Sequence, residues 1–140
     1  MKIYNGEGLI LGRLATVVAK DLLLGEEVNV INCEKIVISG DKFNTFGVEK
    51  QKRERGGYPL KSQKYSRLPS FFVKRMIRGM LPWKESRGKV CYHNLKCYIG
   101  TPAELAGQKA LTLEKASVKK LPTMKYITVE EVCKNLGGNF

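Results

Sequence analysis

Apolar positions near the start of the chain form two short runs with a helical repeat between them. The runs, residues 2–4 and 28–31, have the length and the β-branched or aromatic content of strands. The stretch between them predicts an amphipathic helix that ends near Gly25, with an apolar stripe made of Leu11, Leu14, Ala15, Val18 and Leu22. Strand, helix and strand in this order are typical of a βαβ unit, in which the two strands are parallel.

Further along, the same patterns predict more strands and two helix starts. Residues 36–38 form another β-branched run, and residues 90–99 and 124–127 predict two later strands. Capping boxes at residues 101–104 and 128–131 each predict the first turn of a helix, because Thr precedes a Glu three positions later. This mixture of strands and helices predicts a single α/β domain.

A second amphipathic helix is expected over residues 71–80, and we interpret it as the element around which the rest of the chain is organised. Its predicted apolar face consists of Phe72, Val73, Met76, Ile77 and Met80. Lys74, Arg75 and Arg78 fall outside that face, and Pro82 ends the pattern because proline has no N–H to donate. One side of this helix is thus expected in the core, and the other side displays cations.

The positive charge of the chain is concentrated around this helix. The chain has a formal net charge of +12, and residues 50–89 hold 13 of its 25 Lys and Arg but only 2 of its 13 Asp and Glu. A neutral frame that carries one basic block favours binding to a polyanion such as RNA. The alternative is a solvated basic face, although acids are normally interspersed on such a surface.

A long loop is predicted inside the basic block. Residues 41–55 are polar, with only a loose helical pattern, and residues 56–68 read as a loop in which cations alternate with Tyr58 and Tyr65. Each tyrosine ring either offers a stacking face to an unpaired base or anchors the loop on the core. The sequence leaves both alternatives open.

No arrangement of residues typical of catalysis is present in the sequence. We find no Ser/His/Asp set and no phosphate-binding G-x-x-x-x-G-K run, and the four cysteines and the single His do not have the spacing of a zinc site. We therefore expect no enzyme activity, no cofactor and no metal. No apolar run approaches the about 20 residues of a membrane span, and unpaired cysteines favour a cytoplasmic protein with reduced thiols.

Three motifs, taken in order, resemble the L13 family of large-subunit ribosomal proteins. They are Gly12-Arg13-Leu14-Ala15-Thr16, then Val30-Ile31-Asn32-Cys33-Glu34-Lys35-Ile36, and above all Arg78-Gly79-Met80-Leu81-Pro82 followed by Arg87-Gly88. The resemblance covers roughly residues 1–102 and is closest to archaeal members. Trp83 departs from the His or Lys expected after Pro82, and residues 103–123 are not covered.

The resemblance implies a three-layer α/β/α domain over residues 1–140, with a mostly parallel four-stranded sheet and a basic loop extension. It also implies a structural role in the cytoplasmic ribosome, with large-subunit ribosomal RNA and neighbouring ribosomal proteins as partners and no small-molecule substrate. The rival hypotheses are a free-standing RNA-binding regulator of translation and a nucleotide-dependent RNA-modifying enzyme. The predicted RNA-binding residues are Arg13, Lys52, Arg53, Arg55, Lys61, Lys64, Arg67, Lys74, Arg75, Arg78, Trp83, Lys84, Arg87 and Lys89.

Overall fold

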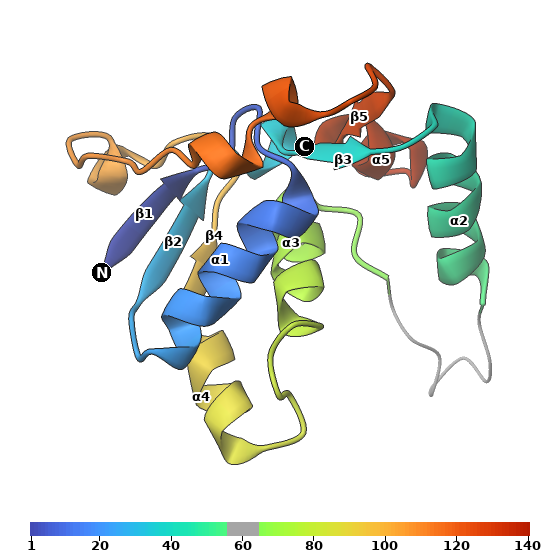
Figure 1. The fold of residues 1–140 in the computed structure, drawn as a ribbon. Helices are drawn as coiled ribbons and strands as arrows, with labels where there is room; N and C mark the ends of the chain where they lie inside the picture. The colour runs from blue at the N-terminus through green and yellow to red at the C-terminus, as the bar shows by residue number, and fades with distance from the viewer. Residues whose placement is uncertain (56–64) are drawn as a thin grey trace.

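Three short parallel strands form the main sheet of the computed structural model, which describes residues 1–55 and 65–140 (Figure 1). They are β1 (Lys2–Asn5), β2 (Val28–Ile31) and β4 (Leu95–Cys97), and β2 lies in the middle. Helix α1 (Leu11–Leu23) connects β1 to β2, so the predicted βαβ unit is confirmed. The sheet is parallel as expected, but the prediction of four strands is not confirmed.

The two faces of this sheet are covered differently. Side chains alternate along each strand, and Tyr4, Val28, Val30 and Leu95 belong to the main core together with residues of α1 and α3 (Pro69–Arg78). On the opposite face, Ile3 and Ile31 pack with Leu105, which lies in the 3-10 turn η2 (Ala103–Leu105). A helical third layer is therefore not confirmed.

The β-branched run at residues 36–38 gives rise to a strand, but this strand lies outside the parallel sheet. Strand β3 (Val37–Ser39) pairs antiparallel with β5 (Tyr126–Thr128), far along the chain. The parallel sheet instead gains one isolated bridge at its β1 edge, between Tyr4 and Leu111. Local sequence predicts that a run is extended, whereas its partner depends on contacts between distant parts of the chain.

The two predicted helix starts have different outcomes. Helix α5 (Val129–Asn135) begins as predicted, because the Thr128 hydroxyl accepts a hydrogen bond from the backbone N–H of Glu131 at 3.3 Å. Residues 101–104 lead only into the single 3-10 turn η2, whose N-cap is Pro102. The loose pattern at residues 41–55 does form a helix, α2 (Lys42–Glu54), capped by the side chain of Asp41.

The strand predicted over residues 90–99 is mostly wrong, because its first part is helical. Helix α4 (Ser86–His93) precedes β4, which keeps only Leu95–Cys97. Val90 and Tyr92 favour strands by propensity, but α4 packs its Cys91 side against the core beside α1. Tertiary packing decides the conformation of this segment.

Three further 3-10 turns complete the described elements. Turn η1 (Cys33–Lys35) joins β2 to β3, and η3 (Glu114–Ala116) and η4 (Val118–Lys120) lie between β4 and β5. None of the helices in the described residues is long and apolar enough to cross a membrane.

Candidate nucleic-acid interface

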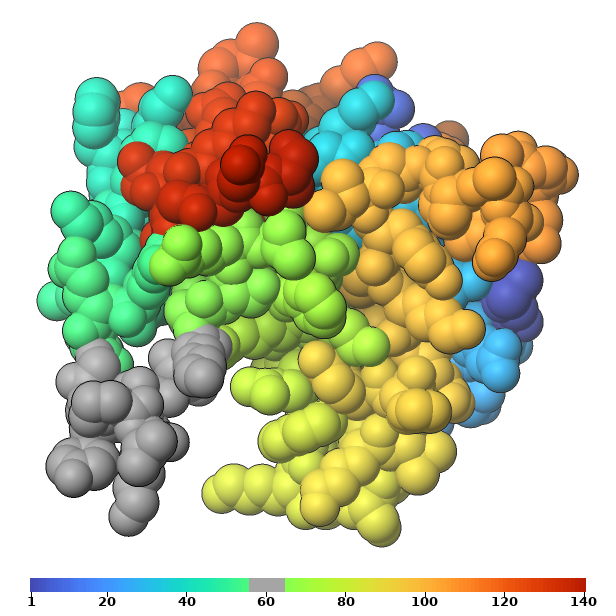
Figure 2. All heavy atoms as spheres, turned by 180° about the vertical axis from the view of Figure 1, so that it is seen from behind, coloured from blue at the N-terminus to red at the C-terminus, as the bar shows by residue number. Residues whose placement is uncertain are grey.

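Helix α3 holds the centre of the predicted basic block. Pro69 occupies its first turn, where a missing N–H costs nothing, and the helix ends at Gly79. Phe72, Val73 and Ile77 are buried, and they fix the helix against α1, β4 and α5. Figure 2 shows residues 65–80 (green) between α2 (teal) and α4 (yellow), so the cations of α2 and α3 lie on neighbouring elements.

The prediction that Met76 and Met80 belong to the core is wrong. Their exposed fractions are 38% and 43%, whereas Ile77 is fully buried. By helical spacing Met76 lies on the same side of α3 as Phe72 and Val73. It is nevertheless exposed, because it borders a hollow that no neighbouring element fills. Helical periodicity gives the direction of a side chain, but it does not show how far the neighbouring elements extend.

A basic groove of about 580 Å³ opens at this place. Its lining consists of Lys52, Arg55, Tyr65, Arg75, Met76, Arg78, Gly79 and Met80. The cations come from the last turns of α2 and α3, and the methionines form the apolar part of the wall. Four of the predicted RNA-binding residues are therefore gathered around one concave surface.

Aromatic rings hold two of these arginines in place. The guanidinium carbon of Arg75 lies 4.5 Å from the centroid of the Tyr65 ring, and that of Arg78 lies 5.1 Å from the Trp83 ring. A guanidinium that lies over an aromatic ring can still use the N–H groups at its edge to bind the oxygens of a phosphate. The contact with the ring restricts each arginine side chain before binding, so less conformational freedom is lost when the guanidinium binds an anion.

Tyr65 is anchored on the protein, which decides between the two alternatives for this ring. Its hydroxyl donates a hydrogen bond to the buried carboxylate of Glu49, which also accepts one from Lys52 Nζ at 2.6 Å. The ring packs edge-on against Phe72, with the centroids 6.3 Å apart. Burial raises the pKa of Tyr65, and the bond to Glu49 raises it further, so the hydroxyl stays protonated as a donor. Tyr58 lies outside the described residues.

A second hollow, of about 510 Å³, adjoins the groove at Arg78 and Gly79. It is lined by Arg78, Gly79, Leu81, Pro82, Trp83, Lys84 and Glu85. The rings of Trp83 and Tyr92 pack edge-on, with their centroids 4.8 Å apart. Lys74 Nζ lies 4.8 Å from the centroid of the same Tyr92 ring. Trp83, whose role the sequence left open, thus supports Arg78 and links α3 to α4.

The remaining predicted residues lie elsewhere, and three of them donate to backbone carbonyls. Arg13 contacts Lys115 O at 3.4 Å, Arg67 contacts Gly137 O at 3.3 Å, and Arg87 contacts Leu23 O at 3.1 Å. Arg87 thereby satisfies a carbonyl in the last turn of α1.

The four other predicted residues either lie on helices away from the groove lining or fall outside the described residues. Arg53 is half-buried on α2, Lys89 is exposed on α4, and Lys61 and Lys64 lie outside the described residues. The cluster that the structure does assemble consists of Lys52, Arg55, Lys74, Arg75, Arg78, Trp83 and Lys84.

Sequence reasoning did not find Glu49 and Tyr92 as parts of this site. Glu49 is an acid within a basic segment, and the residues next to it in sequence do not indicate that its carboxylate accepts a hydrogen bond from Tyr65. Tyr92 was expected in a strand, where its ring would not reach Trp83. In the described residues, no group of three or more His, Cys, Asp and Glu side chains is arranged to hold a metal ion.

Comparison with known proteins shows the family. The model of a family described as Ribosomal protein L13 matches residues 1–104. The large ribosomal subunit protein uL13 of Archaeoglobus fulgidus is 43% identical, over 96% of this chain and 86% of its own length. The proteins of the same name from Methanosarcina barkeri and Methanocaldococcus jannaschii are 41% and 38% identical, over the full length of both chains. The chain belongs to the ribosomal protein L13 family.

Proposed function

We propose that this protein is a structural constituent of the large ribosomal subunit and that it binds folded large-subunit ribosomal RNA through the basic groove and the adjoining Trp83 hollow. The observation that carries the proposal is the gathering of Lys52, Arg55, Arg75 and Arg78 around one concave surface. The archaeal relatives are named as large-subunit proteins and align over nearly the whole chain, which supports the ribosomal location. We place the protein in the cytoplasmic ribosome, beside neighbouring ribosomal proteins.

The proposed role is architectural rather than catalytic. Arginines and lysines neutralise phosphates, and the α/β domain behind them is the rigid platform that fixes their positions. The guanidinium of Arg78 is the central contact, because it borders both hollows and is held on Trp83. Its planar fork suits the paired oxygens of a phosphate better than a lysine ammonium does.

The whole chain is proposed to act as one domain in this role. Its main hydrophobic cluster extends from Tyr4 to Leu136, which supports a single folding unit. The family resemblance also implies a fourth parallel strand and a third layer. Two observations support these finer features. An isolated bridge pairs Leu111 with Tyr4 at the edge of the sheet, and Leu105 packs on the second face, although neither residue belongs to a regular strand or α-helix.

The test of the groove is a pair of variants measured for RNA affinity and for stability. Arg78→Gln with Lys84→Gln should weaken binding to deproteinised large-subunit ribosomal RNA by about 1–3 kcal/mol while leaving the melting temperature within a few degrees. Lys20→Gln with Lys96→Gln removes the same charge from exposed positions outside the groove and is the matched control. Equal losses in the two variants would show that net charge, rather than this surface, determines the affinity.

The location is tested separately by sedimentation. A ribosomal constituent co-sediments with the large subunit of a native extract and stays bound at high salt. A free-standing regulator of translation, the first rival hypothesis, would sediment apart from the subunit at high salt. Binding of nucleotides or methyl donors to the purified protein would instead favour the second rival, an RNA-modifying enzyme.

A further inference from the structure

Residues 109–126, the lysine strap, carry a second concentration of positive charge. The strap contains five lysines, namely Lys109, Lys115, Lys119, Lys120 and Lys125, and a single acid, Glu114. All five lysines are exposed, and none forms an ion pair within residues 1–55 and 65–140. By contrast, Lys42, Lys50 and Lys134 on α2 and α5 each pair with a glutamate. The strap therefore presents charge that the protein itself does not neutralise.

The strap is fastened to the domain by its backbone. Leu111 exchanges hydrogen bonds with β1, donating to Ile3 O at 2.7 Å and accepting from Asn5 N at 3.0 Å. Further along, Ala116 O accepts from Ile10 N at 2.8 Å, and Val118 N donates to Gly8 O at 3.0 Å. Ala116 is almost fully buried, so the lysines of turns η3 and η4 stand on a fixed scaffold.

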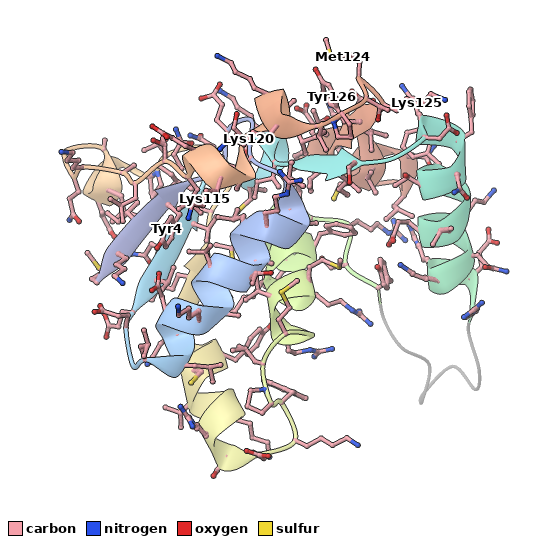
Figure 3. The ribbon with its side chains drawn as sticks, viewed as in Figure 1. Tyr4, Lys115, Lys120, Met124, Lys125 and Tyr126 are labelled. Atoms are coloured by element: carbon pink, nitrogen blue, oxygen red, sulfur yellow. The ribbon has the colours of Figure 1, made fainter. Side chains whose placement is uncertain are left out.

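The strap lies at a different end of the molecule from the basic groove. It crosses the segment that follows β1, at the edge where the arrows of β1 and β2 end, whereas α3 runs away from that edge toward Gly79 (Figure 1). Figure 3 shows Lys115 and Lys120 near this edge, and Met124, Lys125 and Tyr126 further along the strap, toward α2. The exposed fractions of Met124 and Tyr126 are 90% and 43%.

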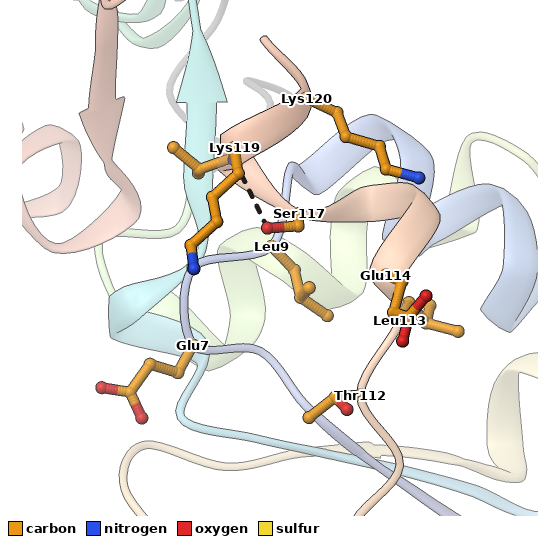
Figure 4. Close-up of a pocket in the computed structure, with 10 residues that line it drawn as sticks. Glu7, Leu9, Thr112, Leu113, Glu114, Ser117, Lys119 and Lys120 are labelled. Carbon is orange, nitrogen blue, oxygen red and sulfur yellow. Dashed lines mark hydrogen bonds between the residues drawn. The ribbon is translucent and has the colours of Figure 1, made fainter.

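The strap also borders two hollows. One, of about 620 Å³, lies between Glu7, Gly8 and Leu9 on one side and the strap on the other, with Lys119 and Lys120 at its rim (Figure 4). The other, of about 530 Å³, lies between the strap and Arg13, Thr16 and Val17 of α1. Arg13, predicted from the sequence to bind RNA, therefore belongs to this surface and not to the groove, since it already contacts Lys115 O.

We propose that the lysine strap, together with Arg13, is a second RNA-binding surface, so that the protein holds two separate segments of RNA at two ends of one rigid domain. The inference rests on the proposed function, because it assumes that the partner is large-subunit RNA. Five lysines spread along a narrow band match the repeating charge of a nucleic-acid backbone, and the ring of Tyr126 offers a stacking face among them. The whole strap lies beyond residue 104, where the match to the family model ends.

Hydroxyl-radical footprinting on deproteinised large-subunit ribosomal RNA tests this inference with the full chain and three triple variants. The strap variant carries Lys115→Gln, Lys119→Gln and Lys120→Gln. The groove variant carries Arg55→Gln, Arg78→Gln and Lys84→Gln. The control carries Lys20→Gln, Lys96→Gln and Lys134→Gln, three exposed lysines that lie in neither surface. Thermal melts of all four proteins establish that each one folds.

The unaltered protein and the control should protect two separate RNA segments. The strap variant should lose one of them and keep the other, and the groove variant should show the reverse. The strap variant should also reduce the slope of log affinity against log salt by about 2–3, since each contacted phosphate contributes about 0.7–0.9.

Two results would overturn the inference. A strap variant that keeps both protected segments and the salt slope of the control shows that these lysines do not bind RNA. A strap variant that keeps both segments but no longer joins a reconstituted subunit assigns the strap to a protein neighbour instead. Failure of the proposed function looks different, because the unaltered protein then protects no segment at all.

Discussion

At Gly88 the backbone leaves no room for a side chain. A Cβ built at this position would lie 2.1 Å from the carbonyl oxygen of Pro82, which belongs to the chain that enters α4. The glycine of the Arg87-Gly88 pair is therefore required by packing, and the arginine beside it donates a hydrogen bond to Leu23 O. Both residues of this family motif hold α4 in place, and through Tyr92 they hold Trp83.

Gly88→Ala should destabilise the domain by about 1–3 kcal/mol, the usual cost of forcing extra volume into a packed site. Gly47→Ala is the matched control, because nothing lies within 4 Å of a Cβ at Gly47 inside α2. There alanine should be neutral or stabilise the helix by up to about 1 kcal/mol. Urea unfolding of both variants measures the difference, and equal midpoints would contradict the steric argument.

Asp21 links stability to pH at the scale of a single residue. Its buried carboxylate accepts hydrogen bonds from Tyr4 and from Lys2 Nζ, and these tie the end of α1 to β1. Burial by itself would raise the pKa of Asp21, but the bonds from Tyr4 and Lys2 outweigh burial and lower the pKa below its usual value. The carboxylate is thus more acidic in the folded chain than in the unfolded chain.

Because the folded state holds this carboxylate ionised, its contribution to stability is complete above the unfolded pKa of about 3.9 and is lost as the pH falls through the lower folded value. Asp21→Asn should be less stable than the unaltered protein at pH 7. Its free energy of unfolding should also decline less between pH 5 and pH 3. Parallel curves for the two proteins over that range would show that Asp21 does not carry the acid sensitivity.

At the scale of elements, α3 has one face in the core and one edge in the groove. Ile77→Asp places an unpaired carboxylate in a fully buried position, which should cost several kcal/mol of a domain stability of about 5–15 kcal/mol. Met76→Asp lies next to it in sequence but on the groove wall, where water reaches the new carboxylate.

Met76→Asp should therefore fold with a small loss of stability but bind RNA less tightly, because it adds a negative charge among four cations. Ile77→Asp should lose cooperative melting. Thermal melts and RNA affinities of the two variants decide the matter. If Met76→Asp unfolds and Ile77→Asp does not, the assignment of the two sides of α3 is wrong.

The elements that the sequence predicted best are those whose apolar positions follow one repeat on a fully covered face. Helix α1 is the clearest case, since Leu14, Ala15, Val18 and Leu22 are all buried. The sequence pattern did not reveal the features that depend on distant parts of the chain. Strand β3 pairs with β5 at the far end of the sequence, and α4 is helical although Val90 and Tyr92 favour a strand.

The site shows the same division between local and non-local information. The charge pattern placed Arg75 and Arg78 on the outer side of a helix, and the structure puts both of them on the groove. The hydrogen bond from Tyr65 to Glu49 crosses from the chain before α3 to α2, and no local spacing reveals it, whereas Lys52 and Glu49 are three residues apart on α2. The distinction between groove and strap was also absent from the sequence, because it depends on where two segments lie on the folded domain.

At the scale of the whole molecule, the charge predicts how binding responds to salt. Each phosphate that the protein neutralises releases condensed counterions, so the slope of log affinity against log salt counts the contacts. With about five phosphates bound, we expect a slope of roughly −3 to −5 for a large-subunit RNA fragment. Filter binding at a series of potassium chloride concentrations gives this slope directly. The groove variant should bind with a shallower slope than the unaltered protein, whereas the three-lysine control should keep the slope nearly unchanged. A slope near zero in the unaltered protein would mean that neither basic surface lies at the interface, and binding would then have to depend on apolar and hydrogen-bonded contacts alone.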